Sequence, residues 1–268
     1  MPLTVFQEKL ARILAVNRTP ESHLAGGAAI HLGPNSIRFS NDLDYFNDSL
    51  EKVAEAFSAD FMLLIKNSFE VKVEIQQPGY IRARIVMGAE ATKVEWAMDS
   101  SWRFMPAVKD EICGYRLHGI DLATNKILAL AGRNEPRDFI DILDLNKKYL
   151  SFGALVWAAV AKDPGFNPRS LLELLKRRGK FRPEDFLRLH LNVKLNQEEM
   201  KKEYVASLEA AEKFIEERDP EEVGCLYFSP KTKEFFAPDL SHKLNKDYEL
   251  HFGRPGGILP AVLNELRL

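Results

Sequence analysis

The stretch LAGGAAIHLGPNSIRFSNDLDYF, residues 24–46, decides how this chain is expected to fold. An apolar segment closes on the pair Gly26 and Gly27, and after a spacer the stretch ends with Asp42 and Asp44 on alternate positions. Because side chains alternate across a strand, both carboxylates are expected on one face. Carboxylates placed side by side repel each other, and a cation between them, typically Mg²⁺, relieves that repulsion.

Arg38 and Ser40 precede the acidic pair on the same alternation, so all four side chains are expected to point the same way. The glycines upstream let backbone N–H groups approach a phosphate closely. A phosphate cradle beside a metal-binding Asp-x-Asp is the minimum equipment for phosphoryl or nucleotidyl transfer. Gly-Gly alone is common in turns and Asp-x-Asp alone is common in acidic loops, so the functional interpretation depends on their combination.

The stretch resembles the signature of AbiEii/AbiGii-type nucleotidyltransferases, a toxin-related branch of the polymerase-beta-like superfamily. The matching residues are Gly26, Gly27, Arg38, Ser40, Asp42, Leu43 and Asp44. The family usually has Thr or Ser after the second glycine, whereas this chain has Ala28. The hydroxyl that would help to hold a triphosphate is therefore missing, and backbone amides are expected to do that work alone.

Composition excludes several classes of protein. With 268 residues and 46% hydrophobic content, the chain can form one large domain or two small ones around a substantial core. No apolar run is long enough to span a bilayer, so no membrane association is expected. Residues 1–16 lack the features of a signal peptide and predict an amphipathic helix with Phe6, Leu10, Ile13 and Leu14 on one side.

Cys113 and Cys225 are far apart in sequence, which fits a reducing cytoplasm and argues against a disulfide scaffold or a zinc site. The six histidines show no metal-ligand spacing. A formal net charge of −2 excludes a uniformly basic nucleic-acid binder, although a local basic patch is compatible with it.

The pattern along the chain changes from strands to helices near Gly119. A helix is predicted at 49–57, strands at 69–76, 80–87 and 92–98, and one more strand around 110–118. Helices are predicted at 121–133, 136–149, 152–160, 168–177, 183–189 and 198–218, the last with Val205, Leu208, Ala211 and Ile215 as its apolar stripe. The tail predicts a hairpin around Pro230 and a loop after it.

This pattern predicts an α+β fold, with a core at residues 1–118 and, at residues 119–268, a mostly helical lobe with a short strand and loop tail. Periodicity alone gives only a strand-rich half followed by a helix-rich half. The resemblance, which covers roughly the first half of the chain, implies that the core is a polymerase-beta-like nucleotidyltransferase with a mixed sheet and helices.

Glu95 is the predicted third carboxylate of the site. Two divalent cations a few ångströms apart need more anionic oxygen than two aspartates supply, and polymerase-beta-like enzymes take the third acid from a later strand. Glu95 stands among apolar residues on a predicted buried strand, while Asp99, the second choice, falls where that strand should end. A slip of one residue in the strand register would turn Glu95 to solvent, opposite Val94 and Trp96.

Lys126 lies within an apolar helical stripe, where a lysine is normally excluded or extends its charge to the edge of the stripe. The family has a helix with a motif like Leu-x-x-x-Lys-x-x-Ala, which Leu122, Lys126 and Ala129 match. The resemblance implies that Lys126 binds a phosphate. Replacing Lys126 with Ala is then expected to weaken nucleotide binding without unfolding the protein.

Arg137, Asp138 and Asp141 match an Arg-Asp-x-x-Asp motif that the family shows at this point. The resemblance implies that Asp138 or Asp141 positions Lys126 or the attacking hydroxyl, and the sequence does not decide between them. A structural interpretation also holds, because acidic residues complement a helix N-terminus and Arg137 can pair with Asp141 one turn away.

A locally basic run lies in the helical half, formed by Lys176, Arg177, Arg178, Lys180 and Arg182. Such a cluster can follow an RNA backbone, and it can equally be a solvated loop between helices.

The resemblance implies a cytoplasmic nucleotidyltransferase that depends on Mg²⁺ or Mn²⁺ and acts as the toxin of a toxin–antitoxin or phage-defence pair. It would move a nucleoside monophosphate from a nucleoside triphosphate to a hydroxyl acceptor, such as RNA or tRNA, and release pyrophosphate. Asp42, Asp44 and Glu95 would hold metal. The alternative is a non-catalytic module that binds nucleotides or partners and retains the fold. Ala28 favours this alternative, and the intact Asp42-x-Asp44 pair and Lys126 oppose it.

Overall fold

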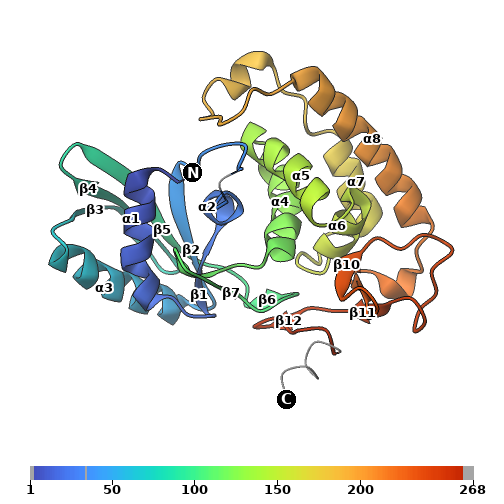
Figure 1. Cartoon of the computed structure of the whole chain (residues 1–268), viewed down its shortest axis with the longest axis horizontal. Coiled ribbons are helices and arrows are strands. Elements are labelled where there is room, and N and C mark those ends of the chain that lie inside the picture. Colours follow the sequence, from blue (N-terminus) through green and yellow to red (C-terminus); the bar gives the residue numbers. More distant parts are fainter. Residues whose placement is uncertain (1–2, 34, 262–268) are drawn as a thin grey trace. The chain divides into compact units, whose positions relative to one another are not determined.

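The computed structural model describes residues 3–33 and 35–261, and the chain divides into two compact units (Figure 1). The first unit comprises Met1–His118 together with the returning segments His190–Val193 and Pro255–Gly257. The second comprises Gly119–Leu189, Lys194–Arg254 and the C-terminal residues. Two short pieces of the chain therefore return to the first unit after the polypeptide has entered the second.

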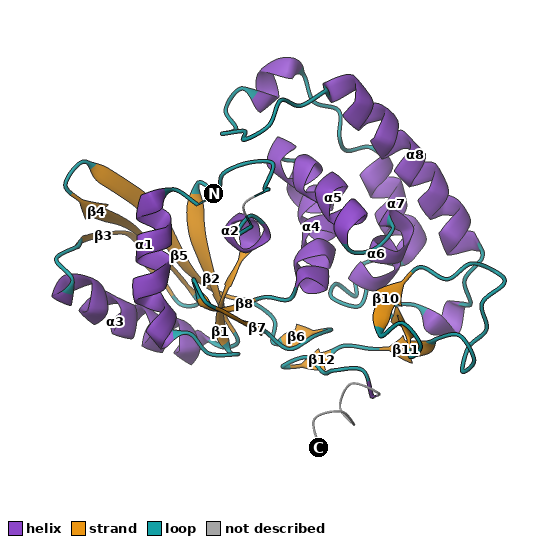
Figure 2. Cartoon of the chain, in the orientation of Figure 1, coloured by secondary structure: helices purple, strands orange, loops and turns teal. Residues whose placement is uncertain are grey.

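The first unit is built on a seven-stranded sheet in the order β3-β4-β5-β2-β1-β8-β7 (Figure 2). Its strands are β1 (Ser22–Ala25), β2 (Asp42–Asn47), β3 (Glu70–Gln77), β4 (Tyr80–Met87), β5 (Glu90–Met98), β7 (Val108–Asp110) and β8 (Gly114–Arg116). β2 runs parallel to β5 and β1 runs parallel to β8, whereas the other pairs are antiparallel. The predicted mixed sheet is thus confirmed. Strand β6 (Trp102–Arg103) pairs with β12 (Arg254–Pro255) in a separate two-stranded sheet.

Three helices accompany this sheet, α1 (Val5–Leu14), α2 (Gly26–Ile30) and α3 (Leu50–Lys66), and a 3₁₀ helix, Ala15–Asn17, follows α1. The Thr4 side chain begins α1 by accepting a hydrogen bond from the Gln7 amide, and the Gln7 side chain accepts one from the Thr4 amide. Phe6, Leu10 and Leu14 are buried, which confirms the amphipathic N-terminal helix.

Helix α3 covers one face of the sheet, and this fixes the orientation of β5. The Trp96 indole donates a hydrogen bond to Asp60 of α3 over 2.7 Å, and its ring contacts Phe57 edge-on. Val94 lies on the same face and is fully buried. Because side chains alternate, Lys93 and Glu95, the residues on either side of Val94, point to the opposite face of the sheet.

Some of the predicted elements differ from the structure. Helix α3 continues to Lys66 rather than ending at residue 57, because neither glycine nor proline interrupts the sequence before the helix ends at Asn67. The region 110–118 is part of a hairpin, β7 and β8, rather than one strand. Strand β2 begins at Asp42, so Arg38 and Ser40 lie before the strand and not on it.

The second unit is mostly helical. Its elements are α4 (Gly119–Arg133), α5 (Pro136–Lys148), α6 (Phe152–Ala159), α7 (Pro168–Lys176), α8 (Gln197–Glu216), and two 3₁₀ helices, Pro183–Phe186 and Pro220–Glu222. A three-stranded sheet follows, with β9 (Leu226–Ser229) between β10 (Glu234–Phe236) and β11 (Glu249–His251). The hairpin predicted around Pro230 is confirmed as β9–β10, whereas the helix predicted at 183–189 is only a 3₁₀ turn.

The apolar stripe of α8 differs from the prediction by one residue. The buried residues of α8 are Tyr204, Leu208, Ala211 and Ile215. Val205, which was predicted to be buried, is 53% exposed. Spacings of three and four residues follow the helical repeat from Tyr204, and Val205 lies about 100° around the axis from it.

Cys113 and Cys225 are both buried and not paired with each other. Among the described residues, no helix combines the length and the apolar character needed to cross a bilayer.

Candidate functional site

The parallel pairing of β2 with β5 brings three carboxylates together in the first unit. Asp42 lies opposite Lys93 and Asp44 lies opposite Glu95, so these four side chains share one sheet face. Ligand oxygens of Asp42, Asp44 and Glu95 all lie within 4.8 Å of one another. Within residues 3–33 and 35–261, no other group of three potential metal ligands is this close. Asp99, the second choice for the third acid, is not part of the group.

A lysine lies between two of these acids. The Lys93 ammonium is 3.0 Å from Asp42 Oδ2 and 3.0 Å from Glu95 Oε1. Burial lowers the pKa of Lys93, but its hydrogen bonds to Glu95 and Asp42 outweigh that effect and raise the pKa above its ordinary value. Arg82, opposite Glu95 on β4, places its Nε 3.0 Å from the same Oε1 atom.

The acidic group has the donor chemistry that Mg²⁺ or Mn²⁺ requires, because all three residues offer carboxylate oxygens. That an ammonium bridges two of the acids shows that this position favours positive charge. The residues present therefore fit a divalent cation.

Two glycines allow the site to pack tightly. Gly26 has φ +60°, and a Cβ atom there would overlap the Asp44 carboxylate. A Cβ atom at Gly27 would lie 3.0 Å from Arg38 Nη2 and 3.1 Å from Ser40 Oγ. Gly26 thus lies beside Asp44, and Gly27 lies beside Arg38 and Ser40, as the sequence motif suggested. Strand alternation does not explain the position of Arg38 and Ser40, because both precede β2.

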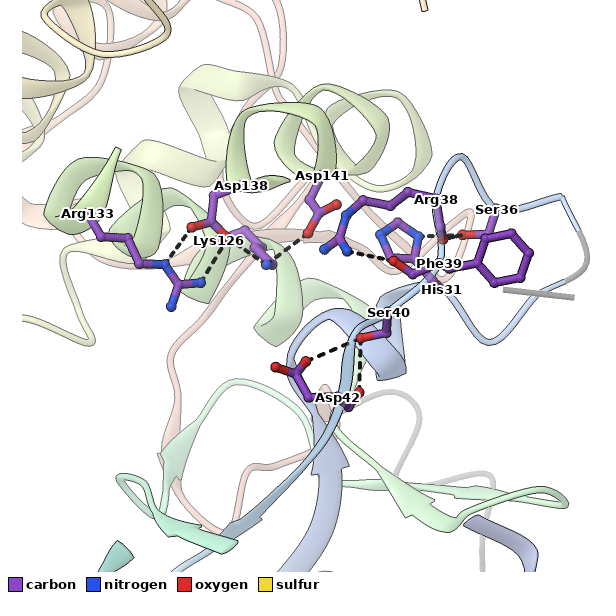
Figure 3. A network of polar contacts seen from close by, with 10 residues as sticks. All are labelled: His31, Ser36, Arg38, Phe39, Ser40, Asp42, Lys126, Arg133, Asp138 and Asp141. Carbon is purple, nitrogen blue, oxygen red and sulfur yellow. Dashed lines mark hydrogen bonds and ion pairs between the residues drawn. The ribbon is translucent and has the colours of Figure 1, made fainter. Parts of the chain in front are cut away.

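Arg38 and Ser40 are held in place by hydrogen bonds within the first unit. The Ser40 hydroxyl donates to the Asp42 carbonyl over 3.0 Å and lies 3.5 Å from Asp42 Oδ1 (Figure 3). The returning segment His190–Val193 forms a β-bridge with Arg38 through Leu191, and the His190 carbonyl accepts from the Phe39 amide. Ala28 is fully buried, so this position has neither a hydroxyl nor an exposed side chain.

In the second unit, Lys126 of α4 reaches between two acids of α5 (Figure 3). Its ammonium is 2.7 Å from Asp138 Oδ1 and 2.8 Å from Asp141 Oδ2, and both acid side chains are fully buried. Arg133 also pairs with Asp138, at 2.6 Å. Burial raises the pKa of Asp138, but the hydrogen bond from Arg133 and the charge of Lys126 outweigh this effect, so the pKa lies below its ordinary value.

This network answers two questions that the sequence left open. Asp138 and Asp141 both contact Lys126, so neither acid alone positions it. Across the described part of the chain, Arg137 forms no ion pair, and its buried Nε has no hydrogen-bond partner. The pairing of Arg137 with Asp141 one turn away is therefore not formed.

Several cations of the basic run 176–182 are already engaged within the second unit. Lys176 pairs with Glu173 and Glu212, and Arg178 donates to the Ala131 carbonyl over 2.8 Å. Arg177 and Lys180 are exposed and form no ion pair with the residues that the structure describes. A pocket of about 480 Å³ lies beside this run, with Lys180, Phe181, Lys201, Tyr204 and Val205 among its lining residues.

Sequence reasoning missed Lys93 and Arg82 as members of the acidic site. A signal for Lys93 was present, because it stands two residues before Glu95 on the same alternation. Arg82 is brought to Glu95 only by the register of β4 against β5, which the sequence does not specify.

The sequence profile of a family described as "Nucleotidyl transferase AbiEii toxin, Type IV TA system" matches residues 9–224 of this chain. Among solved structures, MenT4, a nucleotidyltransferase toxin from Mycobacterium tuberculosis H37Rv, is 16% identical with a TM-score of 0.54, covering 81% of this chain and 84% of that one. JHP933 from Helicobacter pylori is 20% identical with a TM-score of 0.46, covering 78% and 91%. No curated protein matches this sequence.

The family match extends well past the first half of the chain, to which the resemblance of the sequence motifs was confined. At 16% identity, the likeness to MenT4 shows the fold alone. The profile, in contrast, spans most of the sequence, including residues 24–46 and the Arg-Asp-x-x-Asp motif. On this ground the chain belongs to the AbiEii family of nucleotidyltransferase toxins.

Proposed function

We propose that this protein transfers a nucleoside monophosphate from a nucleoside triphosphate to a hydroxyl acceptor and that it needs Mg²⁺ or Mn²⁺ to do so. One observation carries the proposal: Asp42, Asp44 and Glu95 lie within 4.8 Å of one another, beside the Gly26-Gly27 turn. An acidic cation site next to a tight glycine turn is the arrangement that a triphosphate and its counter-ion require.

Asp42, Asp44 and Glu95 would hold the cation. A bound divalent cation supplies positive charge that neutralises the phosphates and polarises the phosphorus–oxygen bonds. The shared sheet face matters here, because strands fix the three carboxylates more rigidly than loops would.

Gly26, Gly27, Arg38 and Ser40 would surround the phosphates. The absence of a side chain at Gly27 leaves its backbone open beside the Arg38 guanidinium and the Ser40 hydroxyl. Arg38 would contribute positive charge, and Ser40, which already donates to the Asp42 carbonyl, would connect the phosphate side of the site to its acidic side. Position 28 is Ala and has no hydroxyl, so backbone amides alone would bind the phosphate oxygens there.

In the reaction, the acceptor oxygen forms a bond to the α-phosphorus while the bond to the β-phosphate breaks. Pyrophosphate leaves with the electron pair of the broken bond, and the proton of the acceptor hydroxyl passes to solvent. The task of the protein is to hold the reactants in line and to stabilise the charge that develops on the phosphates.

Lys126 is proposed to neutralise charge on the phosphates, as the family resemblance implies, with Asp138 and Asp141 as its positioning residues. The contacts of both acids with the ammonium support the positioning role. Arg137, whose buried Nε lacks a partner, is proposed as a further contact to the nucleotide.

The transfer is tested by incubating the purified chain with each α-³²P-labelled triphosphate, total RNA and MgCl₂. We expect label to enter RNA with one or more of the triphosphates, and we expect EDTA or the substitution Asp42→Asn to abolish incorporation. Labelling that survives Asp42→Asn would refute the role of the acidic site. Absence of label with RNA, protein and small-molecule acceptors alike would refute the transfer.

An RNA acceptor such as tRNA is proposed to dock on the basic run of the second unit. Carboxylates of the acidic site repel a bare phosphodiester backbone, so a polynucleotide needs a separate basic surface. Arg177 and Lys180 are the residues to test, because Lys176 and Arg178 already hold other parts of the second unit together.

The double variant Arg177→Glu, Lys180→Glu should weaken RNA binding and reduce the log–log salt slope by about two, since each lost phosphate contact removes about one unit. The matched control reverses Lys202 and Lys213, two exposed lysines of α8, and should leave binding close to wild type. Equal affinities in both variants would point to a protein or small-molecule acceptor.

The type IV toxin–antitoxin family implies an antitoxin partner, which we propose is encoded by a neighbouring reading frame. Expression of this chain alone should arrest growth, and co-expression of that frame should restore it. Arrest by the Asp42→Asn variant would show that toxicity does not come from transfer.

A further inference from the structure

The pocket beside the basic run lies entirely within the second unit. One part of its lining comes from the end of α7 and the loop after it, residues 176–182, and the other part comes from α8. Its volume of about 480 Å³ falls within the range of roughly 300–1,000 Å³ that is typical of small-molecule sites. The lining residues of α8 share one face of the helix, because they are spaced at three and four residues: Lys201, Tyr204, Val205 and Leu208.

Contacts within the second unit hold the two parts of the lining together. Gly179 of the loop has φ +75°, and a Cβ atom there would lie 2.9 Å from the Tyr204 ring and 3.0 Å from that of Phe139. The Gly179 amide donates to Asn134 Oδ1 over 3.2 Å. The Tyr204 hydroxyl donates to the Leu175 carbonyl in α7 over 2.9 Å. The pocket is therefore formed by the fold itself, which lowers the cost of binding a ligand there.

The pocket combines an apolar floor with basic side chains. Phe181, Tyr204 and Leu208 are at most 8% exposed and form the floor, whereas Val205 is 53% exposed. A lining of this kind suits a ligand that has both an apolar surface and negative charge. Among the described residues that line the pocket, none is acidic and five are basic: Lys176, Arg178, Lys180, Arg182 and Lys201.

Two of these cations can bind a ligand without breaking an ion pair, and they come from different elements. Lys180 of the loop and Lys201 of α8 are exposed, and neither pairs with an acid in the part of the chain that the structure describes. Lys176, in contrast, pairs with Glu173 and Glu212. The ligand is therefore expected to carry negative charge at two points, with its apolar part between them.

A nucleotide within an RNA strand has this distribution of charge. Each base offers apolar faces, and the backbone carries a phosphate on either side of it, whatever the sequence. A base can enter a pocket only when it is unpaired and leaves its stack, which is how proteins recognise single-stranded RNA.

We propose that the pocket receives one unpaired base of the acceptor RNA, while Lys180 and Lys201 bind the phosphates on either side of that base. The inference rests on the RNA acceptor of the proposed function and adds that the recognised segment is single-stranded. In this arrangement the floor excludes water from the base, and the two lysines fix the direction of the strand.

The test uses a short single-stranded RNA of mixed sequence with 2-aminopurine at its centre, and the perfect duplex of the same strand. The emission of 2-aminopurine rises when the base leaves its stack, so the full chain should increase it in the single strand and leave it unchanged in the duplex. Val205→Glu places a carboxylate at the wall of the pocket. It should abolish the rise and weaken single-strand binding by about tenfold, with duplex binding unchanged.

Ala206→Glu is the matched control for the added charge. Ala206 is the next residue of α8, is exposed and does not line the pocket, so the new carboxylate lies about 100° around the helix. The rise in emission and the affinity should both stay close to wild type.

Lys201→Gln provides a second measurement that does not depend on the folding of Val205→Glu. It should weaken single-strand binding and reduce the log–log salt slope by about 0.7, since one phosphate contact is lost. Lys202→Gln removes the neighbouring charge, which pairs with Glu198, and should leave the slope unchanged.

A rise in emission that survives Val205→Glu, or equal losses of duplex and single-strand binding in that variant, would overturn the inference. A wild-type chain that binds a polyglutamate peptide and no RNA would also overturn it and would point to an acidic protein partner. Absence of all RNA binding would overturn it together with the RNA acceptor. Single-strand binding as expected, without transfer of labelled nucleotide to any acceptor, would instead refute the proposed function and leave the pocket assignment standing.

Discussion

Each unit gathers charged side chains, and the two units use them in opposite ways. In the first unit, three carboxylates share one sheet face, and Lys93 and Arg82 pair with two of them. In the second unit, Lys126 pairs with both Asp138 and Asp141, and Arg133 pairs with Asp138 as well. The first cluster offers the carboxylate oxygens that a divalent cation prefers, whereas the second is arranged around one buried ammonium.

Exposure separates the two clusters further. The side chains of Asp138 and Asp141 are completely buried, whereas that of Glu95 is 16% exposed. Removing one partner from a buried ion network is strongly destabilising, because it leaves a buried charge uncompensated. Ion pairs that are partly exposed, such as those of Lys93 with Asp42 and Glu95, stabilise the fold little. The two clusters therefore differ in how much of their charge reaches solvent, although both consist of aspartate or glutamate paired with lysine and arginine.

The largest effect is expected from Asp44→Asn. This substitution keeps the shape of the side chain and removes the charge that holds a cation, so transfer should fall about 10³-fold or more. Thermal stability should stay unchanged or rise, because repulsion within the acidic cluster decreases. Primer-independent labelling of RNA and a melting curve measure both quantities. Asp99→Asn, outside the cluster, is the control and should retain near-normal activity.

Lys126→Met should have the next largest effect, and it should act on stability. Removing the ammonium leaves Asp138 and Asp141 buried without it, which should lower the free energy of unfolding by about 3–5 kcal/mol in urea denaturation. Lys148→Met, which breaks an exposed pair with Asp144 on α5, should cost less than about 1 kcal/mol. Equal costs for both variants would show that the buried network is not structural.

Gly26→Ala should have a smaller effect that is confined to the first unit. The φ of +60° makes any side chain costly there by about 1–2 kcal/mol, and the added Cβ displaces the Asp44 carboxylate. We expect weaker Mn²⁺ binding along with a modest loss of stability. Gly88→Ala is a control for backbone strain alone, because it has φ +61° and open space around the new atom. Equal Mn²⁺ affinity in both variants would argue against the contact with Asp44.

The smallest expected effect is the loss, at acid pH, of the contribution that Asp138 makes to the stability of the second unit. Because the folded state lowers the pKa of Asp138 below its ordinary value of 3.8, its contribution to stability is complete above that value and disappears as pH falls through the lower folded value. The difference in unfolding free energy between wild type and Asp138→Asn should thus be constant from pH 7 to pH 5 and shrink below about pH 4. Urea denaturation at several pH values measures it. If this difference instead grows on acidification, folding raises the pKa of Asp138 and the prediction is wrong.

The sequence predicted the acidic site more fully than it predicted the lysine network. Alternation placed Asp42 and Asp44 on one face, and Glu95 joined them because Val94 and Trp96 are strongly apolar and take the other face. The return of His190–Val193 to Arg38 was invisible in the sequence, since no local pattern specifies a contact more than 150 residues away. Val205 shows a second limit of prediction from sequence. Whether Tyr204 or Val205 is buried depends on the elements that pack against α8, which periodicity does not specify.

Lys126 shows a third limit. The family motif implied that its side chain could be removed without unfolding the protein and that its ammonium binds a phosphate. The burial of two carboxylates against its ammonium changes the first expectation while leaving the second as a proposal. Periodicity identifies which face a residue occupies, but the partner on the facing helix decides what its loss costs.

The pairing of β2 with β5 has a consequence for chains that misfold by a one-residue shift in strand register. Trp96 is anchored to Asp60 on the face opposite the acids, one residue from Glu95. A chain paired one residue out of register would lose Glu95 from the site and would also expose the largest buried ring of the first unit. Exposed apolar surface of that kind is what chaperones and proteases recognise. The correct register of β5 against β2 therefore assembles the acidic site and buries Trp96 in the same step.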